Sequence, residues 1–296
     1  MSVQRAKLLK TTLLTSAALC AFAANSVLCR RALGEETIDA GSFTIIRLLS
    51  GVLVLFILQR VRSSSAEPIK GGSWRAATML FLYAITFSYA YLTLDTGTGA
   101  LILFGAVQIT MILASVITGT RLHWIEWSGV TLAFAGFAYL VAPGITTPTA
   151  TGFLLMSTAG IAWGLYTLLG RGSQSPLTDT AHNFFRTIPF LVIAACFVLW
   201  NAHVSSEGVL LAVLSGGLAS GIGYAIWYAA LPALSPTQAG VLQLLVPVIA
   251  ALGGILVNAE DLSSRLLIAA AMILGGILAV LLGRTYLERR PESSQQ

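Results

Sequence analysis

The sequence predicts an all-α membrane protein whose ten transmembrane helices form two inverted five-helix repeats. Hydrophobic residues make up 56% of the 296-residue chain and charged residues only 10%, a composition outside the range of soluble domains. The charges fall in short intervals, and the apolar runs between them have the length of about 20 residues that a helix needs to cross a bilayer. A faint repeat at an offset of about 140 residues, which carries Gly136 onto Gly276 and Arg31 onto Arg171, divides the chain into two similar halves.

The apolar runs are continuous rather than alternating, which favours helices over the strands of a membrane barrel. The expected spans are 11–29, 41–59, 74–94, 98–118, 125–142, 151–170, 183–200, 208–230, 236–258 and 264–283. The first run follows basic residues and resembles a signal peptide. It is retained as a helix, because its removal would leave the sixth run without a counterpart in the first half.

The loop charges predict the orientation, because loops rich in lysine and arginine stay in the cytoplasm. With the N-terminus inside, the basic loop residues on the outside are Arg30, Arg31 and Arg265, and both termini are cytoplasmic. Since five is odd, the repeat at 146–290 enters the membrane from the face opposite to the repeat at 1–145. Such inverted repeats are typical of secondary transporters that work by alternating access. A short tail at 291–296 is expected to be disordered.

Polar residues within the expected helices need partners away from water, which makes them candidates for a binding site. Asn25 in the first helix is expected either to bond a neighbouring helix or to contact a substrate. Arg47 and Arg186 also lie within helices, where an arginine costs about 2.5 kcal/mol or more at the bilayer centre. Each has a gating or structural role if it reaches the membrane surface or exposed carbonyls, and otherwise meets a substrate carboxylate.

Aromatic residues recur at helical spacing in the expected helices. Tyr83, Phe87 and Tyr91 follow one another at i+4 in the third helix, and Tyr224 lies in the eighth. Tyr83, Phe87 and Tyr224 are deep enough to face a cavity, whereas Tyr91 fits the aromatic belt at a membrane surface. In the eighth helix Gly217 also begins a GxxxG pattern, which lets another helix approach closely.

Trp163 lies near the middle of the sixth helix between Gly160 and Gly164, with Tyr166 close behind it. A tryptophan at this depth is removed from the interfacial belt, and the glycines are expected to leave room for a ring beside the indole. Trp163 is therefore interpreted as the wall of a substrate cavity, with simple packing as the alternative.

Two amides and a proline complete the candidate residues. Gln108 and Gln243 offer uncharged hydrogen-bonding groups near the middle of the fourth and ninth helices. Pro247 removes one backbone hydrogen bond from the ninth helix and bends it. The freed carbonyl either contributes to a cavity or has no role beyond packing.

Several kinds of residue are absent from the helix centres. Aspartate and glutamate occur only at helix ends or in loops, so a buried carboxylate relay for protons is missing and transport without proton coupling is expected. The sequence has no nucleotide-binding GxxxxGK[ST] and no zinc-binding HExxH. We therefore expect no enzyme, no cofactor, no metal ion and no nucleic-acid partner, and no obligate protein partner, which is compatible with a monomer.

Three segments resemble the EamA branch of the drug/metabolite transporter superfamily: AANSVLCRRALG at 23–34, SFTIIRLLSGVLV at 42–54 and AGVLQLLVPVIAALGGI at 239–255. Within that branch the chain is most similar to the bacterial YddG-type exporters of aromatic amino acids, which implies a bacterial inner-membrane protein.

The resemblance implies that helices 1, 3, 4, 6, 8 and 9 surround a central cavity for a neutral or aromatic amino acid. The residues expected to bind the substrate are Asn25, Tyr83, Phe87, Gln108, Trp163, Tyr166, Tyr224 and Gln243. The alternatives are transport of sugar phosphates, nucleotide sugars or drugs, or lipid scrambling. A sugar-phosphate carrier would need several basic groups at mid-depth, and a multidrug pump would need a membrane carboxylate.

Overall fold

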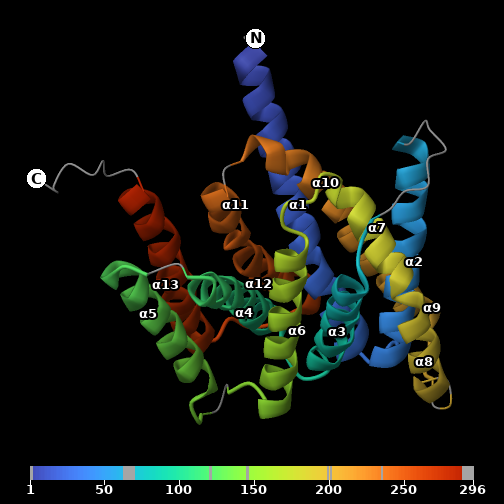
Figure 1. The fold of residues 1–296 in the computed structure, drawn as a ribbon. Helices are drawn as coiled ribbons and strands as arrows, with labels where there is room; N and C mark the ends of the chain where they lie inside the picture. The colour runs from blue at the N-terminus through green and yellow to red at the C-terminus, as the bar shows by residue number, and fades with distance from the viewer. Residues whose placement is uncertain are drawn as a thin grey trace, which may run out of the picture.

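The computed structural model describes residues 3–62, 71–119, 122–144, 147–198, 200, 202–234 and 236–288, and the tail expected at 291–296 lies outside them. Within these residues, nine helical segments are long and apolar enough to cross a membrane. A further helix, α3 (Trp74–Ala90), has 17 residues. The described part of the chain contains no strand beyond one isolated β-bridge (Figure 1). An all-helical membrane protein is therefore confirmed.

The helices follow the order of the expected spans. Their bounds are α1 (Val3–Gly34), α2 (Ala40–Arg62), α4 (Thr96–Ile117), α5 (Trp124–Val141), α6 (Ala150–Leu169), α7 (Pro176–Arg186), α8 (Ile188–Val198), α9 (Ser206–Val213), η2 (Leu214–Ile222), α10 (Gly223–Ala230), η3 (Leu231–Ala233), α11 (Pro236–Gln243), α12 (Leu245–Asn258) and α13 (Ser264–Glu288).

Proline residues interrupt two of the expected spans. A proline lacks the N–H that would bond the carbonyl four residues earlier, and its ring clashes with that carbonyl. Pro189 accordingly follows a break at Thr187 between α7 and α8. Pro247 follows a break at Leu244 between α11 and α12, so the bend expected in the ninth helix is confirmed.

The seventh span begins earlier than the sequence analysis predicts. Its first helix starts at Pro176 rather than at residue 183, with the proline in the first turn, where a missing N–H costs nothing. The added residues include four polar ones, Thr178, Asp179, Thr180 and His182, and they follow the turn after α6.

The eighth span is not a uniform α-helix, because η2 is a nine-residue π-helix between α9 and α10. Three of its nine residues are glycines, and π-helical turns occur mostly as short insertions within α-helices, frequently at functional sites. A Cβ at Gly217 or at Gly221 would lie 3.1 Å from Val54 of α2. The expected close approach of another helix at this GxxxG pattern is therefore confirmed.

Two helices, α5 and α13, pack side by side at one edge of the molecule (Figure 1). Gly129 and Gly276 face each other in this pair, since a Cβ on Gly129 would lie 2.5 Å from the carbonyl oxygen of Gly276. Small residues allow this contact in a membrane, where close packing of helices replaces the hydrophobic effect as the source of stability. The pair contributes no residue to the cavity described below.

Candidate functional site

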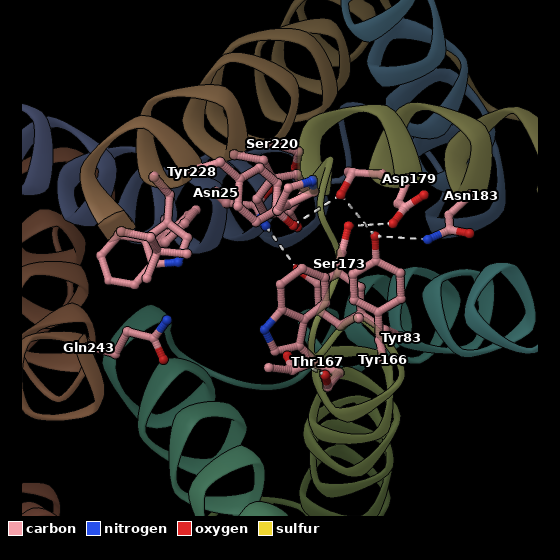
Figure 2. Close-up of a pocket in the computed structure, with 18 of the residues that line it drawn as sticks. Asn25, Tyr83, Tyr166, Thr167, Ser173, Asp179, Asn183, Ser220, Tyr228 and Gln243 are labelled. Atoms are coloured by element: carbon pink, nitrogen blue, oxygen red, sulfur yellow. Dashed lines mark hydrogen bonds between the residues drawn. The ribbon is translucent and has the colours of Figure 1, made fainter. Parts of the chain in front are cut away.

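A cavity of about 320 Å³ lies between the helices, within the range of small-molecule binding sites. All six helices that the family resemblance implies contribute to its wall, and α7 contributes as well. The expected residues that line it are Asn25, Tyr83, Phe87, Trp163, Tyr166, Tyr224 and Gln243. Figure 2 labels four of them, Asn25, Tyr83, Tyr166 and Gln243.

An aromatic cluster around Trp163 forms one wall of the cavity. The indole stacks on Tyr166 at 5.1 Å and on Tyr224 at 5.3 Å between ring centroids, with interplanar angles of 23° and 20°. Tyr83 lies 4.9 Å from the same indole in a tilted arrangement. Rings of the protein itself therefore occupy positions beside Trp163 that were expected to receive a substrate ring.

The glycines that flank Trp163 serve helix packing. A Cβ on Gly160 would lie 2.5 Å from Cβ of Ala106, and a Cβ on Gly164 would lie 2.9 Å from Cβ of Thr110. Both neighbours belong to α4, so the two glycines bring α6 close to α4 and provide no space for a substrate. The expectation that they leave room beside the indole is wrong, because a missing side chain accommodates a second helix as readily as a ligand.

A buried hydrogen-bond chain links α1, α2, α3 and η2, and two of its members, Asn25 and Tyr83, line the cavity. The Ser215 hydroxyl donates to Oδ1 of Asn25 at 2.6 Å, and Nδ2 of Asn25 donates to the Tyr83 hydroxyl at 3.2 Å. The Arg47 guanidinium donates to the same hydroxyl at 2.9 Å. Asn25 therefore bonds neighbouring helices and also lines the cavity, so its two expected roles coexist.

Arg47 neither reaches the membrane surface nor bonds an exposed carbonyl in the described contacts. Its side chain is 2% exposed, and its guanidinium lies over the rings of Tyr83 and Phe87 at 5.2 and 4.7 Å from their centroids. The expected snorkelling is wrong for this residue, because the guanidinium is buried against two rings of α3. Arg186 instead donates to the carbonyl of Gly71 at 2.7 Å, as one of its expected roles requires.

The polar face of α7 is part of the site and was not predicted. Asp179 and Asn183 are four residues apart and both line the cavity. Their side-chain oxygens accept from the backbone N–H groups of Gly72 and Ser73, each at 2.8 Å. The i+4 spacing of these residues is visible in the sequence, but Asp179 lies before the span expected at 183–200, so the pair was not recognised.

Thr180, on the same helix, connects two tyrosines of the cavity wall. Its hydroxyl lies 2.9 Å from the Tyr228 hydroxyl and accepts from the Tyr166 hydroxyl at 3.3 Å. These bonds hold the hydroxyl ends of the two rings, so the cavity combines apolar ring faces with a polar edge.

Besides Arg47 and Arg186, two of the expected residues lie outside the cavity wall. Gln108 is 1% exposed within α4 and does not line the cavity, so its expected substrate contact is wrong in this conformation. Pro247 is buried in α12, and its effect on the site is indirect. Because Pro247 cannot donate to the carbonyl of Gln243, it breaks the helix where Gln243 reaches the cavity.

The cavity reaches the surface at the turn after α6, where Arg171 and Gly172 are exposed and belong to its lining. This turn lies toward the same end of the molecule as the N-terminus (Figure 1). Within the described residues, no group of three or more histidine, cysteine, aspartate or glutamate side chains could hold a metal ion.

A polar cluster closes the opposite end of the molecule, where α1 ends. Glu260 accepts from Nε of Arg30 at 3.3 Å, and also from the backbone N–H and hydroxyl of Thr96, at 2.9 and 3.0 Å. Nη2 of Arg30 lies 3.7 Å from Asp95. We call Arg30, Asp95, Thr96 and Glu260 the latch, because they join α1 to the α3–α4 and α12–α13 connections.

Burial raises the pKa of Glu260 above its ordinary value, although the Thr96 donors and the Arg30 cation oppose that shift. Tyr91 lies beside the latch, fully buried, with its hydroxyl donating to the carbonyl of Thr96 at 3.3 Å. The expected place of Tyr91 in the interfacial aromatic belt is therefore wrong, because the α3–α4 connection covers it.

Comparison with known proteins places this architecture among transporters. The model of the EamA-like transporter family matches residues 150–282. The chain is 49% identical over 275 residues to an uncharacterized protein of Pseudomonas aeruginosa, a match that covers 93% of this chain and 96% of that protein. It is 28% identical over 193 residues, 62% of each chain, to the threonine/homoserine exporter RhtA of Escherichia coli.

The fold also resembles that of a solved structure titled only as the crystal structure of a protein. The TM-score is 0.61 at 18% sequence identity, and the match covers 90% of this chain and 98% of the other. At this identity the likeness shows a shared fold and nothing about substrate.

Proposed function

The chain belongs to the EamA-like transporter family of the drug/metabolite transporter superfamily, and from this premise we propose that it exports neutral amino acids, aromatic ones included. Its family is one of membrane transporters, so the cavity is a transport site rather than an enzyme active site. The observation that carries the proposal is a cavity with aromatic walls and a polar edge of amides and hydroxyls.

The chemistry of an amino acid matches this cavity. The rings of Trp163 and Tyr224 provide apolar contact for a side chain, and the amides of Asn25 and Gln243 provide neutral hydrogen-bonding groups. The name of the relative RhtA, a threonine/homoserine exporter, supports neutral amino acids as the substrate class. A sugar phosphate fits less well, because its dianion calls for several cations in direct contact.

The open and closed ends support alternating access as the mechanism. We assign the open end, near Arg171, to the cytoplasm and the latch to the outside, with both termini in the cytoplasm of a bacterial inner membrane. Substrate would then enter from the cytoplasm and leave when the latch opens. Two inverted repeats, at 1–145 and 146–290, are the arrangement that gives such a protein two near-equivalent conformations.

We expect proteoliposomes that contain only the purified protein to take up labelled phenylalanine, tryptophan and threonine down their gradients, without a proton gradient. The physical reason is that the helix centres carry no carboxylate, and the one acid that lines the cavity, Asp179, lies in the first turn of α7. The measurement compares initial rates with and without an imposed pH gradient, across amino acids, sugar phosphates and a fluorescent lipid. Uptake that requires the pH gradient would contradict uncoupled transport, and preference for sugar phosphates or lipid would contradict the proposed substrate class.

Replacement of Trp163 with alanine is expected to slow transport of phenylalanine and tryptophan about tenfold, and transport of threonine less. Removal of the indole takes away apolar contact worth about 1–3 kcal/mol and releases the rings of Tyr166 and Tyr224 that stack on it. Initial rates in proteoliposomes at equal protein density provide the measurement.

The matched control is Trp127→Ala, which removes a tryptophan that is 51% exposed on α5, outside the cavity lining. Its rates should equal those of the wild type for all three substrates. If Trp163→Ala lowers all three rates by the same factor, the indole supports folding or gating and does not select aromatic substrates.

A further inference from the structure

We propose that the Tyr83 hydroxyl, backed by the buried Arg47 cation, is the group that recognises the carboxylate of the substrate. The inference rests on the proposed function, because it assigns one atom of the cavity wall to one end of an amino acid. It also predicts that the site prefers a substrate with a negatively charged group. Recognition of a neutral side chain alone would give the buried cation no role.

The first observation is that Arg47 is a buried cation without an anionic partner. At 2% exposure it has lost its hydration, and the ion pairs found among the described residues involve Arg30 and Arg31 but not Arg47. Its Nη1 atom has no hydrogen-bond partner in the described structure. Such a charge is costly unless an anion approaches it, so the positive potential around it favours an anionic group in the neighbouring cavity.

The second observation is that Tyr83 lines the cavity and bonds Arg47, which does not itself line the cavity. Nη2 of Arg47 donates to the Tyr83 hydroxyl at 2.9 Å, and Nδ2 of Asn25 donates to the same oxygen at 3.2 Å. A phenol oxygen that accepts two hydrogen bonds still has its own proton to donate. No acceptor for that proton occurs among the described contacts of this hydroxyl, and Tyr83 lines the cavity.

The third observation is that the donors to Tyr83 are themselves fixed. Ser215 donates to Oδ1 of Asn25 at 2.6 Å, which turns the amide N–H₂ toward Tyr83. Arg47 is held by its contact with the rings of Tyr83 and Phe87. The Tyr83 hydroxyl is therefore a preorganised O–H donor that a cation polarises. A carboxylate can bind to one such donor, whereas a phosphate dianion calls for several cations in direct contact.

The experiment compares equilibrium binding of four probes to the purified full-length protein by isothermal titration calorimetry. The probes are phenylalanine, phenylalaninamide, 3-phenylpropionate and 2-phenylethylamine, at a pH where the amines are protonated. We expect the wild type to bind phenylalanine at least tenfold more tightly than phenylalaninamide. It should likewise bind 3-phenylpropionate at least tenfold more tightly than 2-phenylethylamine. Tyr83→Phe keeps the ring but removes the O–H, and it should abolish that preference.

The matched control is Tyr228→Phe, which removes a hydroxyl of the same cavity that bonds Thr180 and lies outside the Arg47 chain. This variant should keep the ratio of acid to non-acid affinity, whatever it does to the absolute values. The inference is overturned if the wild type binds acid and amide equally, or binds none of the probes, or if Tyr83→Phe lowers all four affinities by the same factor.

The outcomes also separate this inference from the proposed function. Selective binding of the acids by the wild type, lost in Tyr83→Phe, supports the carboxylate site even if proteoliposomes fail to transport phenylalanine. Transport of phenylalanine by a protein that binds phenylalaninamide equally well supports the export function and overturns the carboxylate site.

Discussion

Replacement of Gly216 with alanine is expected to prevent accumulation of a folded protein or to lower its thermal stability sharply. A Cβ at this position in η2 would overlap the carbonyl oxygen of Arg47 and lie 2.6 Å from the carbonyl carbon. These are backbone atoms of α2, which cannot move aside as the tip of a flexible side chain can. Overpacking of this kind costs about 1–3 kcal/mol and in rigid places more. Thermal unfolding in detergent and the yield of monodisperse protein are the measurements.

The control for this variant is Gly275→Ala in α13. A Cβ on Gly275 meets no atom within 4 Å, and alanine favours a helix over glycine by about 0.5–1 kcal/mol. Gly275→Ala should therefore unfold at the same temperature as the wild type or higher. Equal stability of the Gly216→Ala and Gly275→Ala proteins would show that the contact between η2 and α2 is looser than the structure indicates.

Removal of the Glu260 carboxylate is expected to open the latched end of the molecule. In Glu260→Ala, Arg30 and Thr96 lose a shared charged acceptor, and hydrogen bonds to charged groups contribute about 1.5–3 kcal/mol each. The readout is the reaction of a maleimide with Cys29, which is fully buried on α1 one turn from Asn25. Its labelling rate should rise about tenfold or more in a protein whose Cys20 and Cys196 are replaced by serine.

The matched control is Glu35→Ala at the same end of the molecule. Glu35 forms an ion pair with Arg31, but their side chains are 46% and 35% exposed, and exposed pairs of this kind contribute little to stability. Its loss should leave the labelling of Cys29 unchanged. Equal labelling rates in the two variants would mean that the latch does not hold this end closed.

Most of the fold could be predicted, because a long apolar segment that crosses a bilayer forms a helix. A chain in hydrocarbon must satisfy its backbone hydrogen bonds internally, so each apolar run becomes a helix. The breaks at Thr187 and Leu244 follow from prolines that the sequence displays. The π-helix η2 could not be predicted, since one extra residue within a helical turn leaves no periodic mark in a glycine-rich segment.

The candidate site could be predicted in composition but not in contacts. Asn25, Tyr83 and Trp163 were identified because polar or aromatic side chains at mid-membrane depth are costly or unusual without a role. Sequence spacing relates residues of one helix, whereas the partners of Arg47 lie on α3, and only the folded chain shows which helices meet. For the same reason Gly160 and Gly164 could not be assigned to α4 packing, because a glycine records the absence of a side chain and not what fills the space.

The π-helix has a consequence for how this chain tolerates insertions and deletions. An α-helix turns by about 100° per residue, so a helix that loses one residue presents a different face beyond the lost position. If η2 were shortened by one residue and became α-helical, Tyr224, Trp227 and Tyr228 of α10 would rotate away from the cavity that they line. A surface loop can change its conformation when it loses a residue. Here, however, the π-helical turn determines the direction in which the aromatic side chains of α10 point. Homologues that carry the same wall should therefore keep the length of this segment even where its residues differ.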